Sequence, residues 1–324
     1  MNAILTDLKD RAILSFYAMK GKMGIHFRQD IGVTLHLFDT LVKPILLYGS
    51  DFWGCLKLPK NNPIENVHMR FCKDLLGVQK QTPNLGFLLE LGRISITIFP
   101  KKNCVKNWER IAINKNANSL IKAGYNSDAR SNVGWANTMK DYLSGIGLLD
   151  IFLNINRANR KPLHIETFIR EKDIFYQTSF FTLQNESPKL KTYAKLKNYI
   201  GMEHYLNSVS TIEHRISMTK LRLSNHKLMI EKGRHNNIES HKRFCPFCPN
   251  CIENECHFLL TCPAYSTGRL KLLNHIHIGD NPIRNENLFI NLLTEKHWVN
   301  DTAEFIWNAN HIRDFLLERH KHFI

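Results

Sequence analysis

The sequence predicts a mostly α-helical protein. Along most of the chain, apolar residues recur at intervals of three and four, which is the period of one face of a helix. Stretches in which apolar and polar residues alternate, as in a half-buried strand, are few, and no internal repeat or low-complexity tract is present. Hydrophobic residues make up 43% of the chain and aromatic residues 10%, which is enough to build a core. A length of 324 residues predicts about two domains.

The first region, residues 1–113, contains a series of amphipathic helices. The opening helix has an apolar stripe formed by Ile4, Leu8, Ala12, Phe16 and Met19. A second helix is expected over residues 34–48, where Pro44 should kink or end it because proline has no N–H to donate. A third begins after Pro63 and ends near Gly77. A short helix after Asn84 and another from Val105 onward complete the region.

A soft boundary is expected at residues 114–134, which are rich in Asn, Ser, Gly and Ala. Residues 135–232 then predict a helical connector, with helical segments near 135–149, 163–183, 190–206 and 211–231. Residues 233–270 form a basic segment that leads into a cluster of cysteines, and residues 271–324 predict closing helices.

The segment 211–231 has two apolar stripes. One contains Ile212, Ile216, Leu223 and Ile230, whereas Leu221 and Leu228 lie on nearly the opposite face of the predicted helix. Such a helix is wedged between neighbours and leaves only narrow basic edges exposed. Two interpretations remain open: a packed core helix with solvated ends, or a helix that faces nucleic acid.

The net charge is the second informative quantity. The chain has 44 Lys and Arg against 29 Asp and Glu, so its formal net charge is +15. A basic surface gains affinity for phosphates by counterion release, which points to RNA or DNA as a partner. The alternative is that the charge only keeps the protein soluble. The excess is concentrated at 215–243, where we take Arg215, Arg222, Arg234, Lys242 and Arg243 as candidate nucleic-acid contacts.

Five of the eight cysteines lie within eighteen residues. They are Cys245, Cys248, Cys251, Cys256 and Cys262, and His257 lies among them. The pattern C-x2-C-x8-H-x4-C provides three thiolates and an imidazole, a set that suits tetrahedral Zn²⁺. We choose Cys245, Cys248, His257 and Cys262 as ligands of a structural zinc, because they give one ligand pair at each end of a short loop. Cys251 or Cys256 could replace one of them.

Disulfides and coincidental thiols are the alternatives to a metal site. Five clustered cysteines leave one unpaired, and Cys55, Cys72 and Cys104 lie far upstream. The first ten residues are interrupted by charge too early for a signal peptide, so we expect an intracellular protein, nuclear or cytoplasmic and not secreted. Clustered cysteines in a reducing compartment bind metal more often than they crosslink. The apolar runs are too short to span a bilayer, and we expect neither a membrane nor a small-molecule substrate as partner.

Several segments resemble the C-terminal region of reverse transcriptases from non-long-terminal-repeat retrotransposons. These segments read LFDTLVKPILLYGSDFWG at 37–54, IENVHMRFCKDLLGV at 64–78, LLELGR at 88–93 and RLSNHKL at 222–228. The Cys/His cluster continues the series, and the resemblance extends from about residue 8 to residue 265. The early segments consist largely of packing residues, so their order together with the cluster is more specific than any one of them.

The resemblance implies a thumb-like helical region over 1–113, a connector, and a zinc module that grips retroelement RNA or target DNA. It also implies that Cys245, Cys248, His257 and Cys262 are metal ligands. The chain departs from the family because it contains no Asp-Asp pair. A polymerase palm needs paired aspartates for its two metal ions. We therefore expect a non-catalytic chain that resembles the C-terminal part of such a polyprotein.

Two other functions compete with nucleic-acid binding. In the first, zinc only staples a loop, and the helices bind another protein. In the second, a remnant restriction-like nuclease follows the zinc module and uses Asp280, Glu286, Glu295 or Lys296. Those four residues show no spacing typical of a metal-dependent nuclease, so their expected role is solvated surface.

Overall fold

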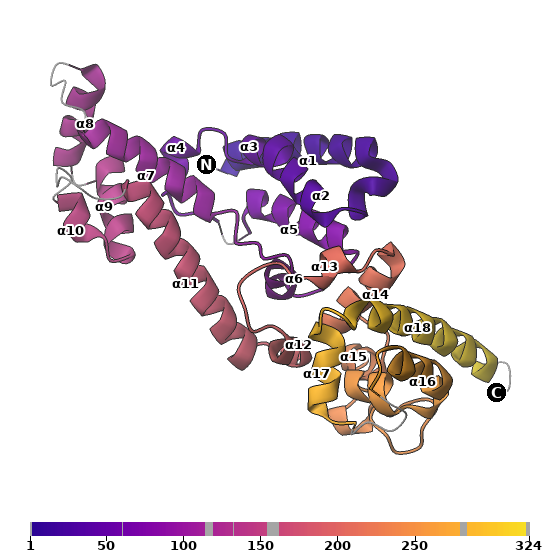
Figure 1. The fold of residues 1–324 in the computed structure, drawn as a ribbon. Helices are drawn as coiled ribbons and strands as arrows, with labels where there is room; N and C mark the ends of the chain where they lie inside the picture. The colour runs from indigo at the N-terminus through magenta and orange to yellow at the C-terminus, as the bar shows by residue number, and fades with distance from the viewer. Residues whose placement is uncertain are drawn as a thin grey trace. The chain divides into compact units, whose positions relative to one another are not determined.

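The computed structural model describes residues 2–59, 61–113, 119–131, 133–153, 162–278 and 284–321. Within these ranges the chain is mostly helical (Figure 1), which confirms the predicted fold class. The β-structure described is limited to two isolated bridges, Leu91 with Met202 and Phe244 with Ile252. None of the described helices combines the length and the apolar character that a membrane crossing requires.

The chain divides into two compact units that are interleaved in the sequence. Unit 1 contains Met1–Lys22, Leu35–Phe71 and Ile94–Phe180, and unit 2 contains Met23–Thr34, Cys72–Arg93 and Phe181–Ile324. The sequential regions expected from composition do not coincide with this division. The soft boundary expected at 114–134 lies within the segment Ile94–Phe180 of unit 1, and its residues 114–118 and 132 lie outside the described residues. In the described part, α8 (Leu120–Arg130) packs against the helices on either side of it.

The first part of unit 1 is built on α1 (Asn2–Met23). Its buried residues are Leu5, Leu8, Ala12, Phe16 and Met19, which is the predicted stripe with Leu5 in place of Ile4. Phe71, from α5 (Pro63–Leu76), packs edge-on against Phe16 and stacks on Phe38 with ring centroids 3.9 Å apart. The helix predicted over 34–48 is interrupted as expected. After α2 (Ile31–Leu37), a π-helical turn at Phe38–Val42 precedes α3 (Lys43–Leu46), in which Pro44 lies in the first turn.

The second part of unit 1 is a helical cluster around Trp108. It combines α4 (Ser50–Trp53), α7 (Ile98–Ile113), α9 (Trp135–Gly145), α10 (Leu149–Leu153) and the start of α11 (Leu163–Asn185). Its buried residues are Cys104, Val105, Trp108, Met139, Leu143, Leu148 and Leu163. Trp108 stacks on Phe152, and its indole N–H donates to the Tyr125 hydroxyl at 3.1 Å. This donation satisfies the one polar group of a fully buried ring.

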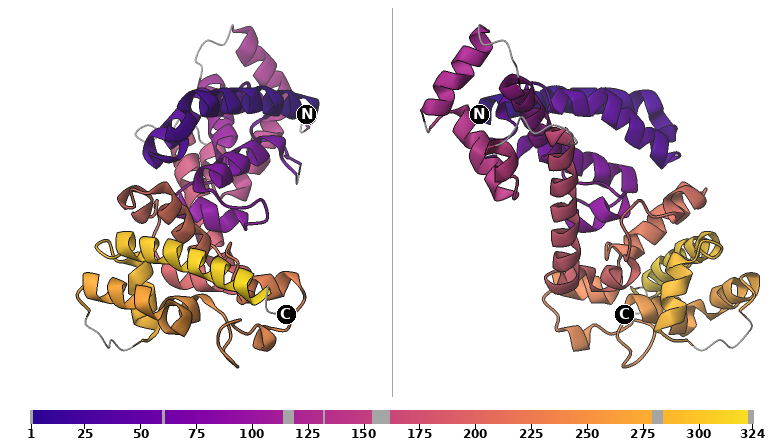
Figure 2. Two further views of the ribbon diagram at one scale, coloured as in Figure 1. Left: turned by 90° about the vertical axis from the view of Figure 1, so that its right-hand side faces the viewer. Right: turned by 60° about the vertical axis from the view of Figure 1, so that its left-hand side comes forward.

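Unit 2 contains the Cys/His cluster. Its helices are α6 (Asn84–Glu90), α12 (Lys191–Leu196), α13 (Tyr205–Ser208), α14 (Ile212–Arg222), α15 (Met229–His235), α16 (Ser266–His275), α17 (Glu286–Thr294) and α18 (Val299–Lys321). Helix α18, yellow in Figures 1 and 2, packs against α14, α16 and α17. Gly92 follows α6 with φ +62°, and a Cβ there would meet the Met202 nitrogen at 2.5 Å. Glycine is therefore required where the two segments pair.

Two helices that the sequence predicts as continuous are broken in unit 2. The segment 190–206 stops after α12, because Lys197 turns inward to Glu203 and Gly201 takes φ +147°. The segment 211–231 stops at the end of α14, because Ser224 is left-handed with φ +50° and the Asn225 amide bonds to Gln79. The apolar residues that lie on opposite faces of the predicted helix thus belong to two helices and the turn between them.

Candidate metal centre

The four predicted ligands come together in unit 2. The ligand atoms of Cys245, Cys248, His257 and Cys262 all lie within 4.8 Å of one another. The Cys262 sulfur lies 3.9 Å from that of Cys245 and 3.7 Å from that of Cys248. A tetrahedron with Zn–S bonds of about 2.3 Å has S–S edges of about 3.8 Å, whereas a disulfide bond is about 2.05 Å long. The sulfur spacing therefore suits a shared ion and not a crosslink.

A short loop closed by backbone pairing presents the first two sulfurs. The Cys245 N–H donates to the Cys251 carbonyl at 2.7 Å, next to the bridge between Phe244 and Ile252. Asn250 reverses the chain with φ +58°, a conformation that asparagine tolerates better than most residues. This turn places Cys245 and Cys248 on the same side of the loop.

The return segment aligns the other two ligands through a π-helical turn, His257–Thr261. The Asn254 side chain accepts the His257 N–H at 2.7 Å and so caps the start of this turn. The Cys262 N–H donates to the His257 carbonyl at 2.8 Å, five residues back. Because π-helical bonding joins residues i and i+5, the x4 spacing brings His257 and Cys262 to the same side.

The imidazole of His257 is oriented for metal binding. Its Nδ1 lies 3.0 Å from the Thr261 hydroxyl, which in turn donates to the His257 carbonyl at 3.4 Å. When the Thr261 hydroxyl donates to the carbonyl, Nδ1 carries the ring proton and Nε2 has a free lone pair. Nε2 is buried and has no hydrogen-bond partner within the described part of the chain. An unpartnered nitrogen beside three thiols is the donor set that a zinc ion requires.

The thiols are electrostatically coupled. The hydrogen bond from Cys262, and after it the N–H of Phe247, lower the pKa of Cys245 to about 5, although burial opposes them. The same sulfur contact and burial raise the pKa of Cys262, and burial raises that of Cys248. Cysteines bind metals as thiolates, so metal binding at this cluster would release protons.

Buried ionic side chains attach the cluster to the rest of unit 2. Arg313 of α18 binds both Glu253 carboxylate oxygens at 2.8 Å, and Glu253 also accepts the Met229 N–H at 2.6 Å. Arg269 of α16 donates to the Leu259 and Cys262 carbonyls at 2.9 and 2.8 Å. Sequence reasoning missed these residues because only tertiary contacts bring α16 and α18 to the loop.

The remaining cysteines take no part in the cluster. Cys251 is exposed and Cys256 is half-buried, and neither contributes to the gathered ligand set. Across the described ranges, no second group of three or more His, Cys, Asp or Glu side chains is gathered in this way. Of the residues considered for a nuclease, Glu286 forms an ion pair with Lys195, and Asp280 lies outside the described residues.

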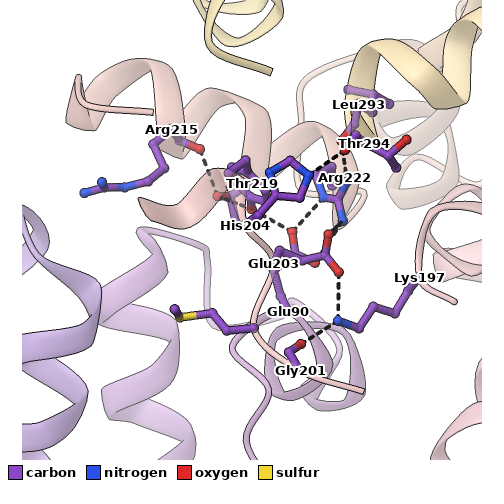
Figure 3. Close-up of polar contacts among 12 residues, drawn as sticks. Glu90, Lys197, Gly201, Glu203, His204, Arg215, Thr219, Arg222, Leu293 and Thr294 are labelled. Atoms are coloured by element: carbon purple, nitrogen blue, oxygen red, sulfur yellow. Dashed lines mark hydrogen bonds and ion pairs between the residues drawn. The ribbon is translucent and has the colours of Figure 1, made fainter. Parts of the chain in front are cut away.

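Arg222, predicted as a nucleic-acid contact, lies in the interior of unit 2. Its side chain is 0% exposed and donates to Glu90 at 2.7 Å, to Glu203 at 2.7 Å and to the Leu293 carbonyl at 2.7 Å (Figure 3). Lys197 binds the other oxygen of Glu203 at 2.7 Å. We call Glu90, Lys197, Glu203 and Arg222 the buried ion network.

Arg215 is also buried in unit 2. It is 4% exposed and donates to the Leu206 and Val209 carbonyls at 3.1 Å. The burial of both arginines corrects the sequence-based interpretation, because an enclosed guanidinium that is already bonded cannot reach an external phosphate. For the segment 211–231, the structure thus favours the packed-core interpretation.

The three other predicted basic contacts differ from one another. Arg243 is half-buried and donates to the Ile238 and Ile230 carbonyls at 2.9 Å, in space left by the missing side chain of Gly233. Arg234 binds Glu231 at 3.0 Å and remains partly exposed. Lys242 is exposed and lies 2.6 Å from Glu239. Of these three residues, Lys242 is exposed, whereas Arg234 and Arg243 are both half-buried.

Comparison with known proteins adds no relative, since no protein-family model, no curated protein and no solved structure matches the chain.

Proposed function

We propose that this chain is a non-catalytic nucleic-acid-binding protein with one structural Zn²⁺ held by Cys245, Cys248, His257 and Cys262. The observation that carries the proposal is the gathering of these four ligand atoms within 4.8 Å. A zinc ion with four protein ligands has no open position for water or substrate, so it stabilises the fold and does not activate a reactant.

Charge and resemblance support nucleic acid as the partner. A formal net charge of +15 favours binding to a polyanion. Four segments and the Cys/His cluster after them resemble, in the same order along the chain, the retrotransposon region that follows the polymerase. These segments lie at 37–54, 64–78, 88–93 and 222–228. In this proposal the zinc loop keeps the basic segment 233–243 in a fixed conformation, and the ligand is RNA or DNA.

Two measurements test the proposal. Protein purified in reducing buffer is expected to contain about one zinc per chain by elemental analysis. The protein is also expected to bind labelled single-stranded oligonucleotides at low salt, with log affinity falling by about 0.7 per phosphate contacted for each tenfold rise in salt. No binding to single- or double-stranded oligonucleotides at low salt would refute the nucleic-acid role. Absence of zinc would refute the metal site independently.

A specific observation favours a protein partner as the second candidate. Unit 1 exposes several large apolar side chains, including Leu14 of α1 and Phe52 of α4. Apolar contacts differ from phosphate contacts in their response to salt, because they release no counterions. Binding to a protein that persists as salt rises, without any nucleic-acid binding, would favour this candidate.

A further inference from the structure

Two adjoining cavities of unit 2 form a cleft that the sequence does not reveal. Their volumes are about 500 and 410 Å³, and they share Lys189, Ser224 and Glu231 in their walls. Lys189 comes from the turn Pro188–Leu190, and Ser224 and Glu231 lie at the junction of α14 and α15. We call this space the Lys189 cleft.

The cleft has cations without acidic partners. Lys189 and Lys232 line it, and no carboxylate forms an ion pair with either of them in the part of the chain that the structure describes. Two of the acids that line the larger cavity are engaged: Arg234 binds Glu231 at 3.0 Å, and Lys227 binds Asp314 at 2.7 Å. The third, Glu318, is exposed and forms no ion pair with any described residue. The two lysines without ion pairs therefore outnumber the one carboxylate without an ion pair.

The cations are crowded as well as unpaired. Burial lowers the pKa of Lys73, and repulsion from Lys189 lowers it further. Burial also lowers the pKa of Lys189, where attraction to Glu231 opposes this effect and repulsion from Arg234 adds to it. Like charges held this close are stabilised when an anion binds between them.

The wall of the cleft contains an unsatisfied polar group. The side chain of His226 is 4% exposed, and its Nε2 lies 3.0 Å from Glu255. Its Nδ1 is buried and has no hydrogen-bond partner among the described residues, although His226 lines the larger cavity. A buried polar atom without a partner is destabilising, so a polar ligand group that reaches Nδ1 would be favoured there.

We propose that the Lys189 cleft binds the phosphodiester backbone of a single-stranded nucleic acid, with Lys189 and Lys232 contacting phosphates. The inference rests on the proposed nucleic-acid-binding function and specifies where the strand lies. Each cavity is the size of a small-molecule site, so it admits one or two unpaired nucleotides and not a duplex. The two lysines of the cleft supply the positive charge that complements the phosphates. Arg215 and Arg222 are buried and cannot take this role.

The test compares one doubly neutralised variant of the cleft with a matched double control. Lys189→Gln/Lys232→Gln is expected to lower the affinity for a single-stranded 12-mer about tenfold or more at low salt. The salt slope should become shallower by about 1.4, because each lost phosphate contact removes about 0.7. Lys271→Gln plus Lys140→Gln removes the same charge at exposed sites outside the cleft and is expected to change both quantities little. Thermal unfolding shows whether each variant is folded.

Photo-crosslinking of the unmutated chain provides a second measurement. A strand carrying 4-thiouridine or 4-thiothymidine is expected to crosslink to peptides covering 188–195 or 224–235. Parallel experiments with RNA and with DNA strands show which of the two backbones binds. Poly-glutamate, added as a competitor, tests whether any polyanion binds in place of the strand.

Each adverse outcome has a distinct meaning. If the unmutated protein binds the strand but the cleft variant loses no more affinity than the control, the cleft is excluded and the proposed function stands. Crosslinks confined to other peptides, or full displacement by poly-glutamate, exclude the cleft in the same way. If the unmutated protein does not bind at all, the cleft and the proposed function fail together.

Discussion

Two sites in unit 2 hold buried polar side chains, and they differ in whether those side chains satisfy one another. In the buried ion network, Arg222 and Lys197 face Glu90 and Glu203, so two positive groups meet two negative ones at 2.7 Å (Figure 3). In the metal cluster, three sulfurs lie near one another and His257 Nε2 has no partner among the described residues. The network pairs all of its charges, whereas the cluster gathers four donor atoms that could hold a metal ion.

This difference separates structural polar groups from ligand-binding ones. Charges buried without partners are costly, so a network that pairs every charge has a sufficient explanation in stability and specificity. A cluster of donor atoms that repel one another when ionised has no such explanation. Its geometry matches the coordination of a metal ion, which would offset this repulsion.

Removing a metal ligand is expected to have the largest effect. Zinc contributes roughly 10–16 kcal/mol in isolated zinc-finger peptides, and part of that should be lost in Cys262→Ser. We expect the zinc content to fall from about one per chain toward zero and residues 244–262 to lose protection in hydrogen exchange. Cys251→Ser is the matched control, because Cys251 is exposed and outside the cluster. A large loss of zinc in that control would contradict the ligand assignment.

Breaking the buried ion network is expected to cause the second-largest loss of stability. Arg222→Met leaves Glu90 and Glu203 without their shared cation, and removing one partner of a buried pair costs about 3–5 kcal/mol. Urea denaturation at constant zinc should show this loss. Adding Glu90→Gln to the variant should recover part of the stability because it removes an uncompensated charge. If Arg222→Met alone is neutral, the network is not a source of stability.

The support of His257 by Thr261 should have an intermediate effect. Thr261→Val removes the partner of His257 Nδ1, and loss of such support lowers metal affinity about 10- to 100-fold. This corresponds to about 1.4–2.7 kcal/mol and is measured by competition with a zinc chelator. Thr267→Val, a change at an exposed position of α16, is the control. Equal affinities for the two variants would show that Thr261 does not orient the ligand.

Breaking an exposed ion pair is expected to cause the smallest loss of stability. This pair is the comparison for the buried ion network. Lys227 and Asp314 lie 2.7 Å apart, as close as the network's pairs, but their side chains are 74% and 44% exposed. Exposed pairs contribute about 0–1 kcal/mol, so Lys227→Ala should shift the urea midpoint little. A loss comparable to that of Arg222→Met would mean that burial does not distinguish these contacts.

The sequence alone determined features that depend on neighbouring residues. The stripe of α1 follows from helical periodicity, and the interruption near Pro44 follows from the missing N–H. The Cys/His spacing predicted the four side chains that the structure gathers, since eighteen residues folded by local turns bring them together, although Cys251 and Cys256 stayed open as alternatives in the sequence. In each case the determining contacts lie within a few residues along the chain.

Only the tertiary structure decided which charges remain at the surface. A basic residue on a helix edge looks the same in the sequence whether solvent or a carboxylate faces it. Arg222 is buried because Glu90, 132 residues earlier, lies opposite it. Arg215 is buried because it bonds to the carbonyls of Arg28 and Gln29, 187 and 186 residues earlier. Lys189 and Lys232 line one cleft for the same reason. Long-range packing sets these placements, and helical periodicity specifies a face of the helix but not its neighbour.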